Sequence, residues 1–240
     1  MPNTPVHPSP DPNKPYANTS PELKYAASLP VAVMLSMAGG CIDAFVYLNH
    51  GHVFAAVMTG NTVLLGAGLL KNNLSQSAHN AVPIVSFLTG LFCARLLQLT
   101  ATRKYVTLGL IIETAGLFVA SLLPASFPDM AFVALVSFLV AYQVASFRKE
   151  DGEKYNSTFV TADLRSAIDG LSDLLKPSRR PEGRKKAGEL AIIFLSFLAG
   201  AIAAAFLSPR IFNHTLWFAD LLLVLVIVVV LTKSRAAAFR

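Results

Sequence analysis

The chain has 240 residues, of which 54% are hydrophobic and only 14% are charged, and its mean hydropathy is +0.54. This composition excludes an ordinary water-soluble domain, in which about a quarter of the residues are charged. The net charge of +6 does not indicate a nucleic-acid partner, because the basic residues lie between apolar runs, as in cytoplasmic loops that face anionic lipid.

The first segment, residues 1–25, holds seven of the 14 prolines and few apolar side chains. We expect a disordered cytoplasmic tail without a cleavable signal, so that the first apolar helix serves as the insertion signal. A single membrane domain should follow over residues 26–232. Residues 233–240 should form a basic cytoplasmic tail.

The apolar runs predict an all-α, polytopic membrane protein. A spanning helix needs roughly 20 mostly apolar residues. The candidates are residues 27–49, 53–70, 81–100, 105–123, 129–147, 190–208 and 214–232. Both cysteines, Cys41 and Cys93, fall inside these runs, so we expect no disulfide.

Two short matches in the same order indicate an internal duplication. They pair residues 86–90 (SFLTG) with 196–200 (SFLAG), and residues 54–69 with 156–171, which sets Thr59 opposite Thr161 and Asn61 opposite Asp163. The predicted repeat halves are therefore residues 27–123 and 129–232.

The second copy of this motif, residues 157–175, carries several charged side chains and cannot face lipid as a spanning helix. It should be a short re-entrant or surface-lying helix. If residues 53–70 behave in the same way, each half has three spans. An odd number of spans makes the two halves run in opposite directions, as the inverted repeats of many transporters do.

The loop charges favour six spans with both termini in the cytoplasm. In that arrangement all of the lysines and arginines except Lys71, Arg95 and Arg210 lie on the cytoplasmic side. An alternative with seven spans stays open, because residues 53–70 contain no charge and could cross the membrane.

The motif residues predict a polar site near the midplane of the membrane. Glycine permits an unwound turn, and the freed backbone groups can then bind an ion or a small polar solute together with Thr or Asn side chains. The substrate-binding residues we expect are Asp43, Thr59, Gly60, Asn61, Thr161 and Asp163. The alternative is that Thr59-Gly60-Asn61 only caps a helix and lets helices pack closely.

Several other polar residues lie at depth. Asp43 could carry a proton, compensate a cation, or accept hydrogen bonds from the backbone near residues 59–61. Glu113 and Asp220 are further intramembrane acids, and we expect Arg95 to form an ion pair with Glu113. Snorkelling of Arg95 alone, or a proton relay through the acids, is the alternative.

His50 and His52 should be ordinary exposed histidines at the outer boundary, the alternative being a pH-sensing or metal role. The chain has no G-x-S-x-G, H-E-x-x-H or P-loop motif. We therefore expect no catalytic residues, no metal, no cofactor and no enzyme activity.

The first-half motifs resemble those of the YoaK-like family of integral membrane proteins, which are predominantly bacterial and have no assigned function. The matching residues are Gly40-Cys41-Ile42-Asp43-Ala44, Val53-Phe54, Met58-Thr59-Gly60-Asn61 and Glu113. In the second half the family carries a Gln-Asn pair and a second Thr-Gly step. This chain has Gln143-Val144 and Thr161-Ala162 there, and so departs from the pattern.

Together these patterns predict a small-solute transporter or permease in the plasma membrane. The alternative is a non-transporting scaffold or assembly partner whose polar groups only hold helices together. The expected partners are the lipid bilayer, an unidentified small solute and, as an option, a second copy of the chain, with no nucleic acid.

Overall fold

The computed structural model describes residues 28–100, 105–146, 168, 170, 172–173 and 180–238. Within them all regular structure is helical, which confirms the predicted all-α class. The elements are α2 (Leu29–Asn49), α3 (Met58–Leu70), α4 (Leu74–Thr100), α5 (Tyr105–Ser121), α6 (Asp129–Ser146), α8 (Arg180–Ile211), the 3-10 turn η1 (Phe212–Thr215) and α9 (Leu216–Ala238). The predicted N-terminal tail and two predicted site residues, Thr161 and Asp163, lie outside the described residues.

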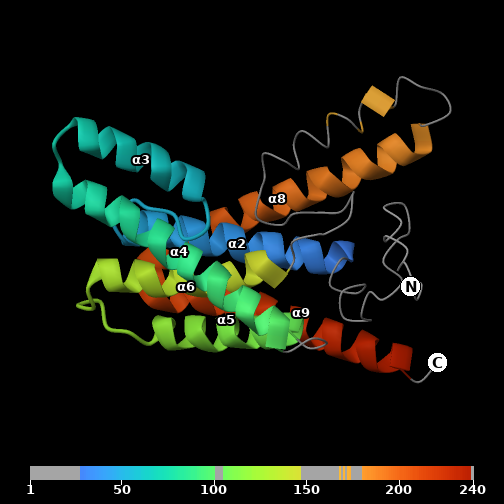
Figure 1. The fold of residues 1–240 in the computed structure, drawn as a ribbon. Coiled ribbons are helices and arrows are strands. Elements are labelled where there is room, and N and C mark those ends of the chain that lie inside the picture. Colours follow the sequence, from blue (N-terminus) through green and yellow to red (C-terminus); the bar gives the residue numbers. More distant parts are fainter. Residues whose placement is uncertain are drawn as a thin grey trace, which may run out of the picture.

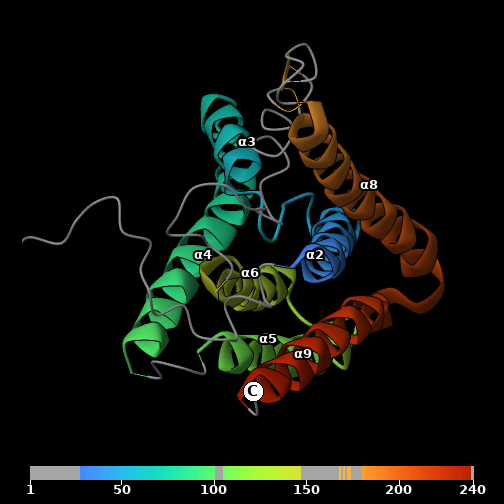
Figure 2. The ribbon, with the colours of Figure 1, turned by 90° about the vertical axis from the view of Figure 1, so that its right-hand side faces the viewer.

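The helices form an antiparallel bundle in which α2 and α6 occupy the interior (Figures 1 and 2). A hydrogen bond from Gln143 Nε2 of α6 to the Leu35 carbonyl oxygen of α2, 3.2 Å long, joins the two. α9 continues to Ala238, so most of the predicted C-terminal tail is helical.

One end of the bundle gathers around His50 and is called the His50 end below. The side chain of His50, just after α2, contacts Asp129 at the start of α6 and Asn213 between α8 and α9. At the other end Gln98 of α4 donates to the carbonyl oxygen of Ala145 of α6. Helices α2, α5 and α8 therefore run toward the His50 end, and α4, α6 and α9 run away from it (Figure 1).

α3 does not cross the bundle. After His50 the chain turns back through Gly51 and His52, both with positive φ. The backbone N–H of Ala56 then donates to Asp43, which lies seven positions before His50 on α2. At 1.5 Å per residue, the loop therefore reaches about 10 Å into the bundle from the His50 end. α3 runs outward from there to the His50 end, where α4 begins (Figure 1).

Among the described residues, three stretches are long and apolar enough to cross a membrane: Leu29–Asn49, Leu74–Thr100 and Gly183–Ser234, the last of which contains most of α8 and α9. Shorter apolar helices cover Met58–Leu70 and Tyr105–Ser121, and a further one begins at Asp129. Large apolar side chains such as Phe92 on α4 and Ile202 on α8 are exposed on the outside of the bundle. This distribution is the one that a bilayer requires.

Glycines bring two pairs of helices into backbone contact. A Cβ on Gly40 of α2 would overlap the carbonyl oxygen of Phe197 of α8, and one on Gly200 of α8 would overlap that of Met37. α4 and α6 touch in the same way, since a Cβ on Gly90 would overlap the carbonyl oxygen of Phe138. Gly90 and Gly200 are the last residues of the matched SFLTG and SFLAG segments, so the repeated glycine serves the same packing purpose twice.

The adjacent glycines Gly39 and Gly40 allow a direct test of this contact. Gly40→Ala should lower the thermal midpoint in detergent strongly, by the equivalent of about 1–3 kcal/mol or more, because the new methyl group meets backbone that cannot move aside. Gly39→Ala should be neutral or stabilising, since nothing lies within 4 Å of its added Cβ. Equal midpoints for the two variants would contradict the close α2–α8 contact.

Candidate functional site

Asp43 holds the loop of residues 53–57 that leads into α3. Its side chain is only 3% exposed, and its Oδ1 accepts the backbone N–H of Ala56 at 2.8 Å. Loop residues lack helical partners for their backbone groups, and an unsatisfied backbone group is costly in an apolar interior. The carboxyl group of Asp43 therefore supplies an acceptor that the loop would otherwise lack.

Asn61 supports the same loop from the first turn of α3. Its Oδ1 accepts the N–H of Phe54 at 2.9 Å, and its Nδ2 donates to the Phe54 carbonyl oxygen at 2.7 Å. A Cβ on Gly60 would lie 3.0 Å from the ring of Phe54, so glycine leaves room for that ring. Thr59 is exposed. Gly60 and Asn61 thus fix the loop, a role that differs from the predicted helix cap, since no side-chain hydrogen bond caps the start of α3.

A pocket of about 300 Å³ opens between α2, this loop and α8. Its walls include Asp43 and Tyr47 of α2, Phe54 and Val57 of the loop, and Phe197 and Ala201 of α8. In Figure 2, α2 lies beside α8 with the loop and α3 on its other side. The second carboxyl oxygen of Asp43, Oδ2, is buried and has no hydrogen-bond partner. Of the predicted substrate-binding residues that the structure describes, Asp43 lines this pocket, whereas Thr59, Gly60 and Asn61 do not.

Glu113 and Asp220 come together inside the bundle. Glu113 on α5 is fully buried and Asp220 on α9 is 7% exposed. None of their four carboxyl oxygens has a hydrogen-bond partner within the described part of the chain. The two groups are close enough to interact electrostatically. Two acids without a basic partner are unusual in an apolar interior, and a proton relay through them stays a prediction.

The predicted ion pair between Arg95 and Glu113 is wrong. Arg95 is exposed on α4, and its guanidinium donates to Oε1 of Gln98 on the same helix at 3.0 Å. The prediction assumed that the consecutive helices α4 and α5 pack along each other. Instead α4 packs against α6, and α5 packs against α6 and α9, so Arg95 faces away from the acids.

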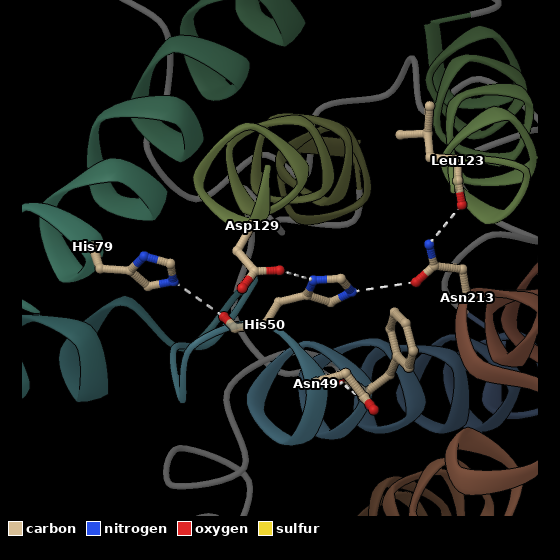
Figure 3. Close-up of polar contacts among 7 residues, drawn as sticks. Asn49, His50, His79, Leu123, Asp129 and Asn213 are labelled. Atoms are coloured by element: carbon tan, nitrogen blue, oxygen red, sulfur yellow. Dashed lines mark hydrogen bonds and ion pairs between the residues drawn. The ribbon is translucent and has the colours of Figure 1, made fainter. Parts of the chain in front are cut away.

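His50 is buried, which corrects the prediction of an exposed histidine; His52 is exposed as expected. The Nδ1 of His50 lies 2.9 Å from Oδ1 of Asp129, and its Nε2 lies 3.3 Å from Oδ1 of Asn213 (Figure 3). The imidazole ring also stacks on Phe132 with centroids 3.9 Å apart. No local spacing relates these residues, so the sequence alone held no signal for the cluster.

The partners of this cluster fix its orientation. Asn213 donates through Nδ2 to the Leu123 carbonyl oxygen at 2.9 Å, which turns its Oδ1 toward His50. His79 of α4 contacts the His50 carbonyl oxygen at 3.2 Å (Figure 3). Both imidazole nitrogens therefore face oxygen acceptors. The His50 side chain joins the end of α2 to the start of α6 and to the turn between α8 and α9.

Substituting each histidine by asparagine compares the buried ring with the exposed one. His50→Asn should destabilise the protein by about 2–4 kcal/mol, because it removes two ring hydrogen bonds and a stacking contact. His52→Asn should change little, since asparagine tolerates the positive φ of this position. Thermal unfolding in detergent measures both. A His50→Asn variant as stable as the His52→Asn variant would show that the cluster does not hold the helix ends together.

The apolar helical bundle, with large apolar side chains on its outside, defines an integral membrane protein. The chain belongs to the family described as "Protein of unknown function (DUF1275)", whose model matches residues 31–229. It is similar to the UPF0700 transmembrane protein YoaK of Bacillus subtilis (strain 168), with 28% identity over 192 residues, which cover 77% of this chain and 85% of the relative. The resemblance to the YoaK-like family is thereby confirmed. No solved structure matches the chain.

Proposed function

We propose that this membrane protein is a transporter or permease for a small solute, which binds in the pocket between α2, the loop of residues 53–57 and α8. The observation that carries the proposal is Oδ2 of Asp43, a buried carboxyl oxygen without a partner in a pocket wall. Buried polar atoms in native proteins are nearly always hydrogen-bonded, and an exception needs an explanation. A polar or charged solute in the pocket that Asp43 lines is one.

The direction of the helices supports an inverted duplication. α2, α4 and α5 run toward, away from and toward the His50 end, whereas α6, α8 and α9 run in the opposite senses (Figure 1). The close glycine contacts are also equivalent: if α2 corresponds to α6 and α4 to α8, the contact of α2 with α8 corresponds to that of α6 with α4. Repeats of opposite orientation place binding sites near the midplane in many transporters.

A second pair of contacts is consistent with this duplication. Gly68 of α3 lies against Ser77 near the start of α4, and Gly170 lies against Ala187 near the start of α8. Gly68 and Gly170 correspond in the match of residues 54–69 with 156–171, and Ser77 and Ala187 are separated by 110 positions, the same offset as the SFLTG and SFLAG segments. Thr161 and Asp163, which the sequence also predicts to belong to the site, lie outside the described residues.

The distribution of charge supports an orientation of the bundle in the plasma membrane, which is part of the proposal. Arg184 near the start of α8 and Lys233 near the end of α9 lie at the end away from His50, whereas Lys71 and Arg210 lie at the His50 end. With the positive-inside rule, six crossings put the His50 end outside and both termini in the cytoplasm.

Single cysteines in a background without Cys41 and Cys93 test this topology in intact cells. A membrane-impermeant thiol reagent should label both His52→Cys and Lys71→Cys from outside, because α3 enters and leaves on one face. Arg184→Cys, the control, should be labelled only after the cells are opened. Labelling of position 71 but not position 52 from outside would instead support seven spans.

The non-transporting scaffold has a specific observation in its favour. Asp43 and Asn61 both hydrogen-bond the loop backbone, and this structural role accounts for the two side chains without a solute. On this alternative Asn61→Ala lowers the thermal midpoint and the protein moves no solute. It would then act by presenting its surface to other membrane proteins.

Transport is tested in proteoliposomes on a solid-supported membrane. Concentration jumps of amines, amino acids, sugars, organic acids and monovalent salts are applied in turn. We expect one class to give a transient current that falls about tenfold or more in Asp43→Asn, a loss typical of a charged hydrogen bond. Asn at this position keeps an acceptor for the Ala56 N–H, so the loop should stay in place.

Thr89→Val on the exposed face of α4 serves as the control and should carry the full current, since its hydroxyl bonds only its own helix. A current of the same size in Asp43→Asn would refute the site assignment. No current with any solute, together with a lower midpoint of Asn61→Ala, would favour the scaffold.

A further inference from the structure

We infer that the pocket at Asp43 binds a small organic cation, a primary or quaternary amine, between the carboxylate and a wall of aromatic rings. The inference deepens the proposed function and rests on it for the transport of this ligand. Binding itself can be measured without transport.

The charge of the pocket favours a cation. Asp43 is the one charged residue among those that line it, and no basic or amide side chain is present among them. An anion or a sugar would leave its oxygens without donors, which is costly away from water. A cationic group instead balances the negative charge of the Asp43 carboxylate, and a primary ammonium can also donate a hydrogen bond to it.

The aromatic rings strengthen this preference. Tyr47 lies one helical turn after Asp43 on the same face of α2. Its ring stacks on Phe54 with centroids 4.9 Å apart and 20° between the planes. Phe197 of α8 also lines the pocket. Faces of aromatic rings attract ammonium groups, and an acid beside such rings is a typical arrangement for amine recognition.

Size and ligand number exclude larger molecules and metal ions. A volume of about 300 Å³ is at the lower limit of small-molecule sites and holds roughly ten water-sized groups. The remaining walls are Gly40 and short aliphatic side chains. Calcium needs six to eight oxygen ligands, and no group of three metal-binding side chains occurs in the described residues.

Calorimetry on the purified full-length protein in detergent tests the inference with charged and neutral ligands of matched shape. Phenethylamine and tetramethylammonium should bind, and 2-phenylethanol, tert-butanol and phenylacetate should bind at least about tenfold more weakly or not at all. Thermal shifts with the same ligands provide a second measurement.

The variants assign the binding to the pocket. Asp43→Asn should lose at least about tenfold in affinity for both cations. Phe54→Leu should lower the affinity for tetramethylammonium in particular. Glu113→Gln removes a buried carboxyl group outside the pocket and should bind as the unaltered protein does. Equal binding of 2-phenylethanol, or full affinity in Asp43→Asn, would overturn the inference.

The two proposals fail separately. If another solute class gives an Asp43-dependent current while the amines do not bind, the inference is wrong and the transporter stands. If the amines bind with the expected dependence on Asp43 but are not moved across the membrane, the ligand class is correct and the transport function is wrong.

Discussion

The structure depends on satisfying the backbone of a short non-helical segment inside an apolar bundle. The loop of residues 53–57 belongs to no helix, and lipid offers no hydrogen bonds to those of its backbone groups that the first turn of α3 does not engage. Asp43 accepts the N–H of Ala56, and Asn61 pairs with both backbone groups of Phe54. Without these two side chains the backbone of the loop would be unsatisfied inside the bundle, and the pocket would lose the wall that the loop provides.

The hydrogen bonds to the loop also explain why Asp43 is available for a ligand whereas Gly60 and Asn61 are not. Asn61 uses its oxygen and nitrogen on Phe54, and Gly60 gives space to the Phe54 ring. Asp43 uses one of its two oxygens on the loop and keeps the other without a partner. Asp43 therefore both holds the loop and lines the pocket.

Local patterns predicted the features that depend on local chemistry. Uninterrupted apolar runs predict helices, and the depth of Asp43, Glu113 and Asp220 follows from their positions within those runs. The backbone role of Asp43 was among the interpretations drawn from sequence, since a polar break in an apolar run needs nearby acceptors. The glycine at the end of each matched segment also behaves alike in the two copies.

Features that depend on which helices become neighbours could not be derived in this way. The pairing of Arg95 with Glu113 failed because consecutive helices α4 and α5 do not pack along each other. The burial of His50 requires Asp129 and Asn213, which lie 79 and 163 positions away in the sequence. Nor does any spacing place Phe197 of α8 beside Tyr47 and Asp43 in one pocket.

The glycine contacts also bear on how the chain assembles while it is being synthesised. α2 is inserted early, yet the helix that touches its backbone at Gly40 is α8, which is made after α3, α4, α5 and α6. Until α8 is inserted, the surface of α2 around Gly40 lacks the helix that it contacts in the folded protein. The pocket wall that carries Asp43 is therefore completed late, when most of the polypeptide has already entered the bilayer.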